Sequence, residues 1–338
     1  MNASFAFRSA TTRRARRRGP WRIRAALAVS AALAYVPAAA VPAYGFGPDT
    51  HTDITTRALS GFQKVSLAAM AAHKIDNTHW GAIQISDHIH AEQTRYHCDD
   101  ADYLATSSYP RTRQQATNEL LACVETAIVG FDKAVAAADR LVDAGGHIKP
   151  AEVALGHPCT YDDRRGRAKC EVFEHLGHAW HVVEDFYAHS NWSDEADPKH
   201  GIGLGNPPGL RQRKPAPFFT LRTYSHQATA AWKKDAAVAV DPKLTTGCVP
   251  GEYESDGKKA DCKGRINHYD SAGQKGLSKE VSRGNVGDNL NQAVKVAVAD
   301  IERQWQDFRD ELLAKYPGRG KKMICALTHD TPTDSTCG

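Results

Sequence analysis

The chain of 338 residues carries 43 basic and 39 acidic residues, which gives a formal net charge of +4 at pH 7. Its first 24 residues hold eight of the arginines and no acid, so the rest has 35 basic against 39 acidic residues and a net charge of −4. That balance excludes capture of nucleic acid by a generally basic surface and leaves only a local basic groove open.

Residues 1–45 have the pattern of a secretory signal peptide. The arginine-rich start precedes an apolar run over 25–41 that contains Pro37, and small residues surround Gly45. A membrane anchor is the alternative, but 17 residues interrupted by proline are short for a bilayer span. We expect removal of 1–45, a secreted (extracellular) mature chain with no transmembrane segment, and an export route that paired arginines leave open between general and twin-arginine.

Cysteine usage agrees with export. All eight cysteines follow the leader, and an even number in an exported chain favours disulfide bonds. Eight cysteines allow roughly a hundred connectivities. Pairing of sequence neighbours predicts the bonds 98–123, 159–170, 248–262 and 325–337. Metal–thiolate binding is the weaker alternative, because the chain has no Cys-x-x-Cys pair.

The apolar residues recur at helical spacing, and no stretch alternates as a strand does. In chain order they predict helices over 50–73 (capped by Thr50 or Thr52), 112–145, 170–190, 219–239 and 288–315. Polar loops are expected over 76–100 (with a short helix), 198–218 and 242–282, and a solvated loop over 318–322. The fold prediction is one all-α domain over 46–338, whose long loops are linked by disulfides.

The helix over 170–190 carries the strongest chemical signal. Residues four apart share a helix face, so His181, Asp185 and His189 form a line of imidazole, carboxylate and imidazole, with His178 near it. These are suitable zinc ligands, and the central carboxylate can bridge two ions. The alternative is hydrogen-bonded core histidines, but burying three such groups without a metal costs several kcal/mol for each charged or unpaired group.

Two further segments offer ligands. Asp87 precedes His97 by ten residues in a loop that continues with Asp99 and Asp100. His51 opens the first predicted helix. Each is weak alone, because solvated Asp and His side chains are common in loops.

Together these segments resemble the superfamily of zinc-dependent phospholipases C and fungal single-strand nucleases, and within it the HET-C-like branch. The run His189-Ser190-Asn191-Trp192 is particularly similar to HET-C proteins. The resemblance covers 46–280. It implies a helical fold and a buried centre of two or three zinc ions.

The resemblance also implies a ligand set. In that superfamily the mature N-terminal residue binds zinc through its amino group and carbonyl, which makes Phe46 a ligand after cleavage at Gly45. The remaining matches are His51, Asp87, His97, His181, Asp185 and His189. The superfamily ends its set with a His and an acid four residues later, and this chain departs from that spacing. His268 and Glu280 are the matches with an insertion, and His200 and His226 are the rivals of His268.

The implied activity is that of a zinc-dependent phosphoric-ester hydrolase, most similar to phospholipase C. Asp185 would bridge two ions, Asp87 would steer or deprotonate the attacking water, and Glu174, Glu184 and Asp99 are candidates for orienting the ligands. Phospholipid is favoured as the substrate, with peripheral membrane contact. Single-stranded nucleic acid is the alternative and needs stacking aromatics such as Trp80, Trp180, Tyr187 and Trp192. A metal-stabilised protein without catalytic activity is the third reading.

Overall fold

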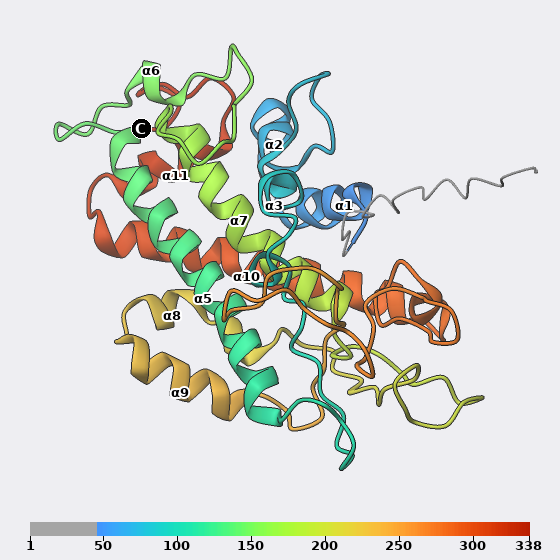
Figure 1. Ribbon diagram of the computed structural model, residues 1–338. Coiled ribbons are helices and arrows are strands. Elements are labelled where there is room, and N and C mark those ends of the chain that lie inside the picture. Colours follow the sequence, from blue (N-terminus) through green and yellow to red (C-terminus); the bar gives the residue numbers. More distant parts are fainter. Residues whose placement is uncertain (1–45) are drawn as a thin grey trace, which may run out of the picture. The chain divides into compact units, whose positions relative to one another are not determined.

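Three long helices form the centre of the protein: α5 (Arg113–Ala138), α7 (Ala168–His189) and α10 (Asn289–Lys315). In the computed structural model (Figure 1), α7 packs against both α5 and α10. The structure describes residues 46–338, and the predicted signal peptide lies outside them. Within that range β-pairing is limited to isolated bridges. The prediction of an all-α fold is confirmed.

Shorter helices surround this centre. The α-helices are α1 (Pro48–Ala58), α2 (Lys64–Ala71), α3 (Ile85–Ile89), α4 (Thr94–His97), α6 (Pro150–Val153), α8 (Leu221–Ser225), α9 (Thr229–Ala239) and α11 (Gly320–Thr328). The 3-10 helices are η1 (Ala82–Gln84), η2 (Asp139–Leu141), η3 (Pro217–Phe219) and η4 (Ser282–Asn285).

Two predicted helices are each divided in the structure, and one predicted loop is partly helical. The helix expected over 50–73 is α1 and α2, separated by a turn that contains Gly61, and its N-cap is Gly47 rather than a threonine. Pro48 suits the first turn because proline has no N–H to leave unpaired there. The helix expected over 219–239 is likewise divided into α8 and α9, and the basic stretch expected as a loop begins α11.

The long helices begin within two residues of their predicted starts, and α7 and α10 also end within two residues of theirs; α5 ends at Ala138, seven residues before its predicted end. Thr112 caps α5, accepting a hydrogen bond from the backbone N–H of Gln115 in a reciprocal capping box. Helix α5 then tightens into η2 before the turn at Gly145-Gly146. The local sequence signal therefore predicts the start of α5 better than it predicts the two divided helices.

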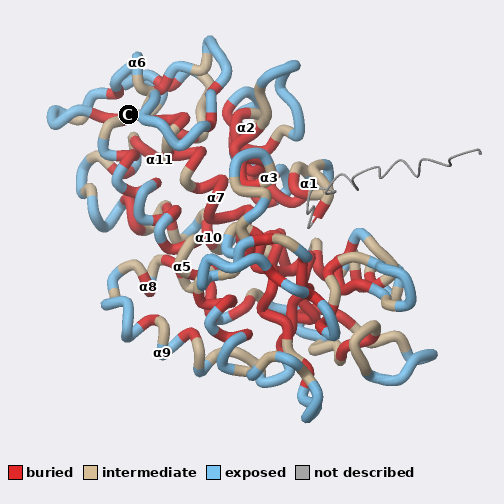
Figure 2. The backbone as a smooth tube through the Cα atoms, viewed as in Figure 1, coloured by how far each residue is buried: buried red, intermediate tan, exposed pale blue. Residues whose placement is uncertain are grey.

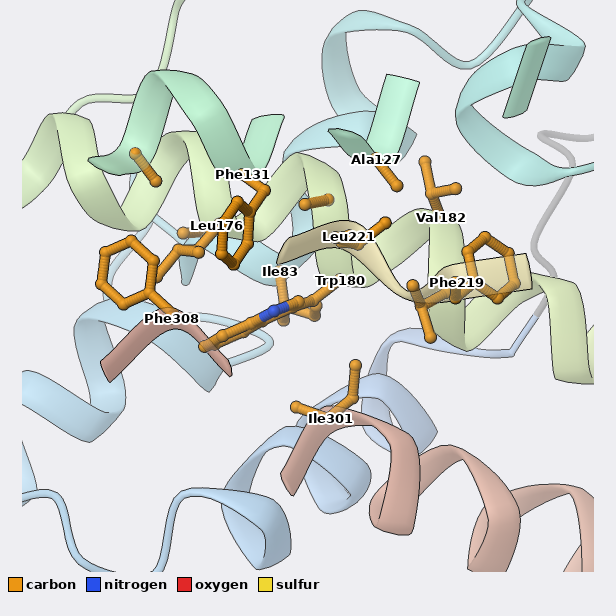
Figure 3. Close-up of a cluster of buried hydrophobic side chains, with 14 of the residues drawn as sticks. Ile83, Ala127, Phe131, Leu176, Trp180, Val182, Phe219, Leu221, Ile301 and Phe308 are labelled. Atoms are coloured by element: carbon orange, nitrogen blue, oxygen red, sulfur yellow. The ribbon is translucent and has the colours of Figure 1, made fainter. Parts of the chain in front are cut away.

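Helix α7 lies in the interior for almost its whole length. Figure 2 shows it as mostly buried, and Trp180, Phe186 and Tyr187 have no exposed surface. Figure 3 shows Trp180 among apolar side chains from several elements, including Ile83 of η1, Ile301 of α10 and Phe308 of α10. A helix that is apolar on every side except its His, Glu and Asp positions fits such a central place.

Two glycines allow close contacts between segments: one between η1 and α7, and one between two loops of the C-terminal half. A Cβ atom at Gly177 of α7 would lie 2.2 Å from the carbonyl oxygen of Ala82, and one at Gly247 would lie 2.5 Å from Cα of His268. No side chain fits at such distances. Gly177 therefore sets the approach of η1 to α7, and Gly247 sets the approach of its loop to the one that carries His268.

Four disulfides link the chain, in the pairing expected from sequence neighbours. They join Cys98 to Cys123, Cys159 to Cys170, Cys248 to Cys262 and Cys325 to Cys337. The first ties the end of α4 to the middle of α5, and the third closes a loop of the C-terminal half. None of the helices in the described part of the chain combines the length and apolar character needed to span a bilayer.

Candidate metal centre

The carboxylate of Asp185 lies between donors on both of its sides. Its Oδ1 is 3.2 Å from Nε2 of His51 and 3.7 Å from Nε2 of His189. Its Oδ2 is 2.9 Å from Nδ1 of His97 and 2.9 Å from Nε2 of His181. Each oxygen thus faces its own pair of imidazoles, which is the arrangement of a carboxylate that bridges two ions.

Asp87 completes the group on the Oδ2 side. Its Oδ1 lies 3.6 Å from Nε2 of His181 and 3.9 Å from Nδ1 of His97, and neither of its oxygens has a hydrogen-bond partner. Ligand atoms about 2.0–2.1 Å from a tetrahedral zinc are about 3.3 Å from one another. The separations around Asp185 and Asp87 spread around that value.

His51 and His181 are each held by a partner that is not one of the candidate metal ligands. Nδ1 of His181 faces the carbonyl oxygen of Ile83 at 2.8 Å, and Nδ1 of His51 faces Oε2 of Glu184 at 2.6 Å. Glu184 also accepts a hydrogen bond from the Thr55 hydroxyl at 2.8 Å. Such contacts fix the imidazole tautomer and direct Nε2 toward the centre, as the partners of metal-bound histidines do.

Phe46 reaches the same centre through its backbone. The residue is buried, and its nitrogen donates to Oδ1 of Asp185 at 3.4 Å. Its ring meets His51 edge to face, with 5.9 Å between ring centroids. A free amino group at this position would add a donor on the Oδ1 side of Asp185, beside His51.

A third group forms at the C-terminal end of α7. Oδ1 of Asp99 lies 2.8 Å from Nδ1 of His189 and 2.8 Å from Nδ1 of His268, while Nε2 of both histidines has no partner. The predicted match His268 therefore joins the centre. Its rivals do not: His200 pairs with Asp197 and His226 with Glu311, both at the surface.

Two unusual backbone positions flank Asp99. Cys98 and Asp100 have φ angles of 54° and 62°, a left-handed conformation that costs of order 1–3 kcal/mol for residues other than glycine. The bond from Cys98 to Cys123 and the salt bridge from Asp100 to Arg265 at 2.8 Å hold this turn in place. The turn buries both His97 and Asp99 against the centre.

Glu280, the expected last ligand, is placed differently. Its Oε1 accepts hydrogen bonds from the backbone N–H of Gly47 at 3.0 Å and from the hydroxyl of Thr50 at 3.2 Å, and the residue is exposed. It belongs to none of the buried groups of His and acidic residues in the described chain. The insertion after His268 carries it past the centre to the start of α1.

Glu252 is a buried acid that the sequence reasoning did not single out. Only 4% of the residue is exposed, and neither carboxylate oxygen has a hydrogen-bond partner. Burial raises the pKa of Glu252 well above its usual range, and the negative charges of Asp99, Asp100, Asp185 and Asp87 raise it further. A cation bound among those acids would oppose this repulsion.

The donor set fits a metal ion better than it fits a hydrogen-bonded core. Ten buried atoms of these side chains have no hydrogen-bond partner, on His51, Asp87, His97, Asp99, His189, Glu252 and His268. An unpaired buried polar group costs about 1–3 kcal/mol, and a charged one costs more. Native proteins rarely leave so many together, and positive ions among them remove the deficit.

The charges inside the centre also favour a cation. Burial opposes ionisation of Asp185, but the nearby His181 and His189 outweigh it and hold the pKa of Asp185 well below its usual range. Burial also opposes protonation of His51, yet Asp185 and Glu184 raise the pKa of His51 well above its usual range. The buried carboxylates thus stabilise positive charge among these histidines, whether a proton or a metal ion carries it.

The aromatic candidates for base stacking are not available near this centre. Trp180 and Tyr187 are fully buried and Trp192 is 6% exposed, and all three pack in the core. Trp80 is half-buried and stacks on His88 with 3.8 Å between ring centroids. Trp180, Tyr187 and Trp192 are therefore core residues, and of the four only Trp80 keeps an appreciable part of its surface exposed.

No protein-family model, curated protein or solved structure matches this chain. The site is defined by its geometry: buried groups of histidine and carboxylate side chains in and around the central helix can hold metal ions.

Proposed function

We propose that the protein is a secreted zinc-dependent phosphoric-ester hydrolase of the phospholipase C type, related to the HET-C-like branch of that superfamily. The observation that carries the proposal is the position of Asp185, whose two oxygens face separate pairs of histidines. Imidazole and carboxylate donors at tetrahedral spacing suit zinc. The four disulfides agree with an oxidising location.

We assign the ligands to three groups. The first comprises His97, His181 and Asp185 with Asp87, and the second comprises Phe46 and His51 with Asp185; Asp87 and His181 also lie within reach of His51. The third comprises Asp99, His189 and His268. Glu252 and Glu280 both lie outside it, and we assign Glu252 to it because Glu252 is buried with neither carboxylate oxygen hydrogen-bonded. Zinc bound in such groups supplies Lewis acidity that activates water and stabilises charge on phosphate oxygens.

The side chains divide the remaining work. Asp87 has both oxygens unpartnered and 5% of its side chain exposed, so it is placed to accept a proton from an attacking water. Asp185 is fully buried and holds the two histidine pairs at fixed separation. Glu184 and the carbonyl of Ile83 orient His51 and His181.

A second candidate function is supported by the burial of the centre. His51, His97, His181, Asp185 and His189 have no exposed surface. Structural zinc sites are closed, whereas catalytic sites keep a position for substrate. A closed centre of this kind suits a protein that metal ions stabilise without catalysis.

The test begins with purified secreted protein whose N-terminus has been sequenced. Elemental analysis should find two or more zinc ions per chain and a start at Phe46, with the ions of the centre around Asp185 lost in Asp185→Asn. Phosphatidylcholine vesicles and single-stranded DNA then serve as substrates. Release of phosphorylated head group by the wild-type protein, lost in Asp87→Asn, supports the hydrolase; full zinc content without hydrolysis of either substrate supports the second candidate. Absence of tightly bound zinc refutes both.

A further inference from the structure

Outside the centre around Asp185, a second cluster of donors forms where α3, the loop before α7 and α7 itself meet. Nε2 of His90 lies 3.1 Å from Oδ2 of Asp163, and Nε2 of His178 lies 3.2 Å from Oδ1 of Asp163. Three donors from three segments thus converge on one point. None of these residues belongs to the centre already described.

We propose that His90, Asp163 and His178 form a separate binding site for a divalent transition-metal ion of the zinc type. Two imidazole nitrogens and one carboxylate are the ligand types that such ions prefer. One ligand atom from each residue lies within 4.8 Å of the others. The proposal is independent of the proposed function, because it uses other residues.

The imidazole planes are fixed before any ion arrives. The ring of Tyr96 stacks on His90 with 3.8 Å between centroids and meets His178 edge to face at 5.5 Å. Nδ1 of His178 faces the hydroxyl of Ser86 at 3.3 Å, which turns Nε2 toward Asp163. Ligands held in this way lose little freedom when they bind a metal.

Asp163 is held equally firmly. Its backbone is left-handed, with a φ angle of 59°, and its N–H donates to Oε1 of Glu174 at 2.7 Å. Glu174, which the sequence suggested as a support for the central ligands, therefore supports this second cluster instead. The strained position directs the carboxylate at both histidines.

The protonation states agree with metal binding. The hydrogen bond from His178 lowers the pKa of Asp163 to about 2, so the carboxylate is ionised near neutral pH. Burial is the largest cause that lowers the pKa of His90, to about 4, so that imidazole is neutral. Neutral imidazole and ionised carboxylate are the metal-binding forms.

The site is partly open, unlike the central one. Asp163 keeps 45% of its side chain exposed, His90 14% and His178 7%. Asp163, His178 and Tyr96 line a cavity of about 790 Å³. Three protein ligands leave a coordination position free for water or a ligand from this cavity.

The test compares zinc content in matched variants of the secreted chain after dialysis against micromolar free zinc. Asp163→Asn should lose one ion relative to the wild-type protein, and Asp185→Asn should lose the central ions while keeping this one. His200→Asn is the control, because His200 pairs with Asp197 at the surface and belongs to no cluster of three. Cobalt bound to Asp185→Asn should show visible absorption bands that the further change Asp163→Asn removes.

Equal zinc content in the wild-type protein and Asp163→Asn overturns the proposal and identifies the trio as hydrogen-bonded residues. If Asp185→Asn does not fold, His90→Asn serves as a second test of the site. This variant is expected to hold one zinc ion fewer than the wild-type protein, as Asp163→Asn does. A wild-type protein that holds only the ion removed by Asp163→Asn refutes the proposed function without affecting this site.

Discussion

Oε2 of Glu184 lies 2.6 Å from Nδ1 of His51, and this contact joins α7 to α1 at the edge of the candidate metal centre. Both residues are fully buried. Burial raises the pKa of Glu184 despite its hydrogen bond to His51. The protonation of this buried pair therefore depends on the charge held in the candidate centre.

Glu184→Gln is expected to lower zinc affinity about ten- to a hundred-fold, because the amide orients His51 without the charge that strengthens its other nitrogen as a ligand. Competition with a chromogenic chelator measures the change. Glu171→Gln is the control, since Glu171 pairs with Arg140 at the start of α7. Equal affinities in both variants would show that Glu184 does not support a ligand.

The choice between Glu252 and Glu280 gives a second prediction. Glu252→Gln is expected to reduce the zinc content by one ion per chain, because Glu252 is buried and neither of its carboxylate oxygens has a hydrogen-bond partner. Glu280→Gln is expected to keep full content, because Glu280 contacts Gly47 and Thr50 instead. Elemental analysis of the two variants side by side decides the assignment, and the reverse result would restore Glu280.

The disulfide at Cys98 should affect both stability and metal binding. Replacing Cys98 and Cys123 with alanine is expected to lower the free energy of unfolding by about 3 kcal/mol and also to weaken zinc binding, because His97 and Asp99 flank Cys98. Removing the bond between Cys325 and Cys337 should lower stability without changing zinc affinity. Denaturant titration and chelator competition separate the two effects. Unchanged zinc affinity without the first bond would contradict its role in holding the turn.

Lys169 makes stability depend on pH. Burial lowers its pKa from 10.5 to about 7, and its ammonium group donates to the Ser66 hydroxyl at 2.9 Å and to the carbonyl of His329 at 2.7 Å. Between these pKa values the unfolded chain binds a proton that the folded chain does not. The free energy of unfolding is therefore expected to rise as the pH increases from about 7 to 10.5, by up to about 5 kcal/mol from this group.

Lys169→Met should remove that rise, while the exposed Lys74→Met should leave it unchanged. Urea titrations at several pH values measure the difference between each variant and the wild-type protein. Parallel profiles for Lys169→Met and the wild-type protein would show that Lys169 stays charged in the folded state.

The central helix was the part of the site most open to prediction. His181, Asp185 and His189 stand four residues apart, and helical geometry alone aligns them. The approach of His51, Asp87 and His97 to that line depends on tertiary packing, so only a resemblance suggested it. Glu252 gave no signal, because it lies in an irregular loop between Cys248 and Cys262 where no periodicity relates it to the helix.

The helices likewise divide into those that the local pattern predicts and those that it does not. The periodic pattern predicts α5, α7 and α10, since each is long and its apolar face is continuous. It fails at residues 59–63 and 226–228, where the apolar spacing continues through a change of direction. The break that lets α1 turn and His51 face Asp185 comes from packing against α7 and α10, which a local pattern does not contain.

Gly177 and Gly247 have no side-chain ligand atom, yet they also help to set the geometry of the site. Gly177 admits the segment whose next carbonyl, that of Ile83, holds His181, and Gly247 admits the backbone of His268. A methyl group at either position would act as a wedge and move a ligand that it does not touch through its side chain. A related chain that keeps all the histidines and acids but has larger residues at these two positions would possess the ligands without the spacing that makes them a site.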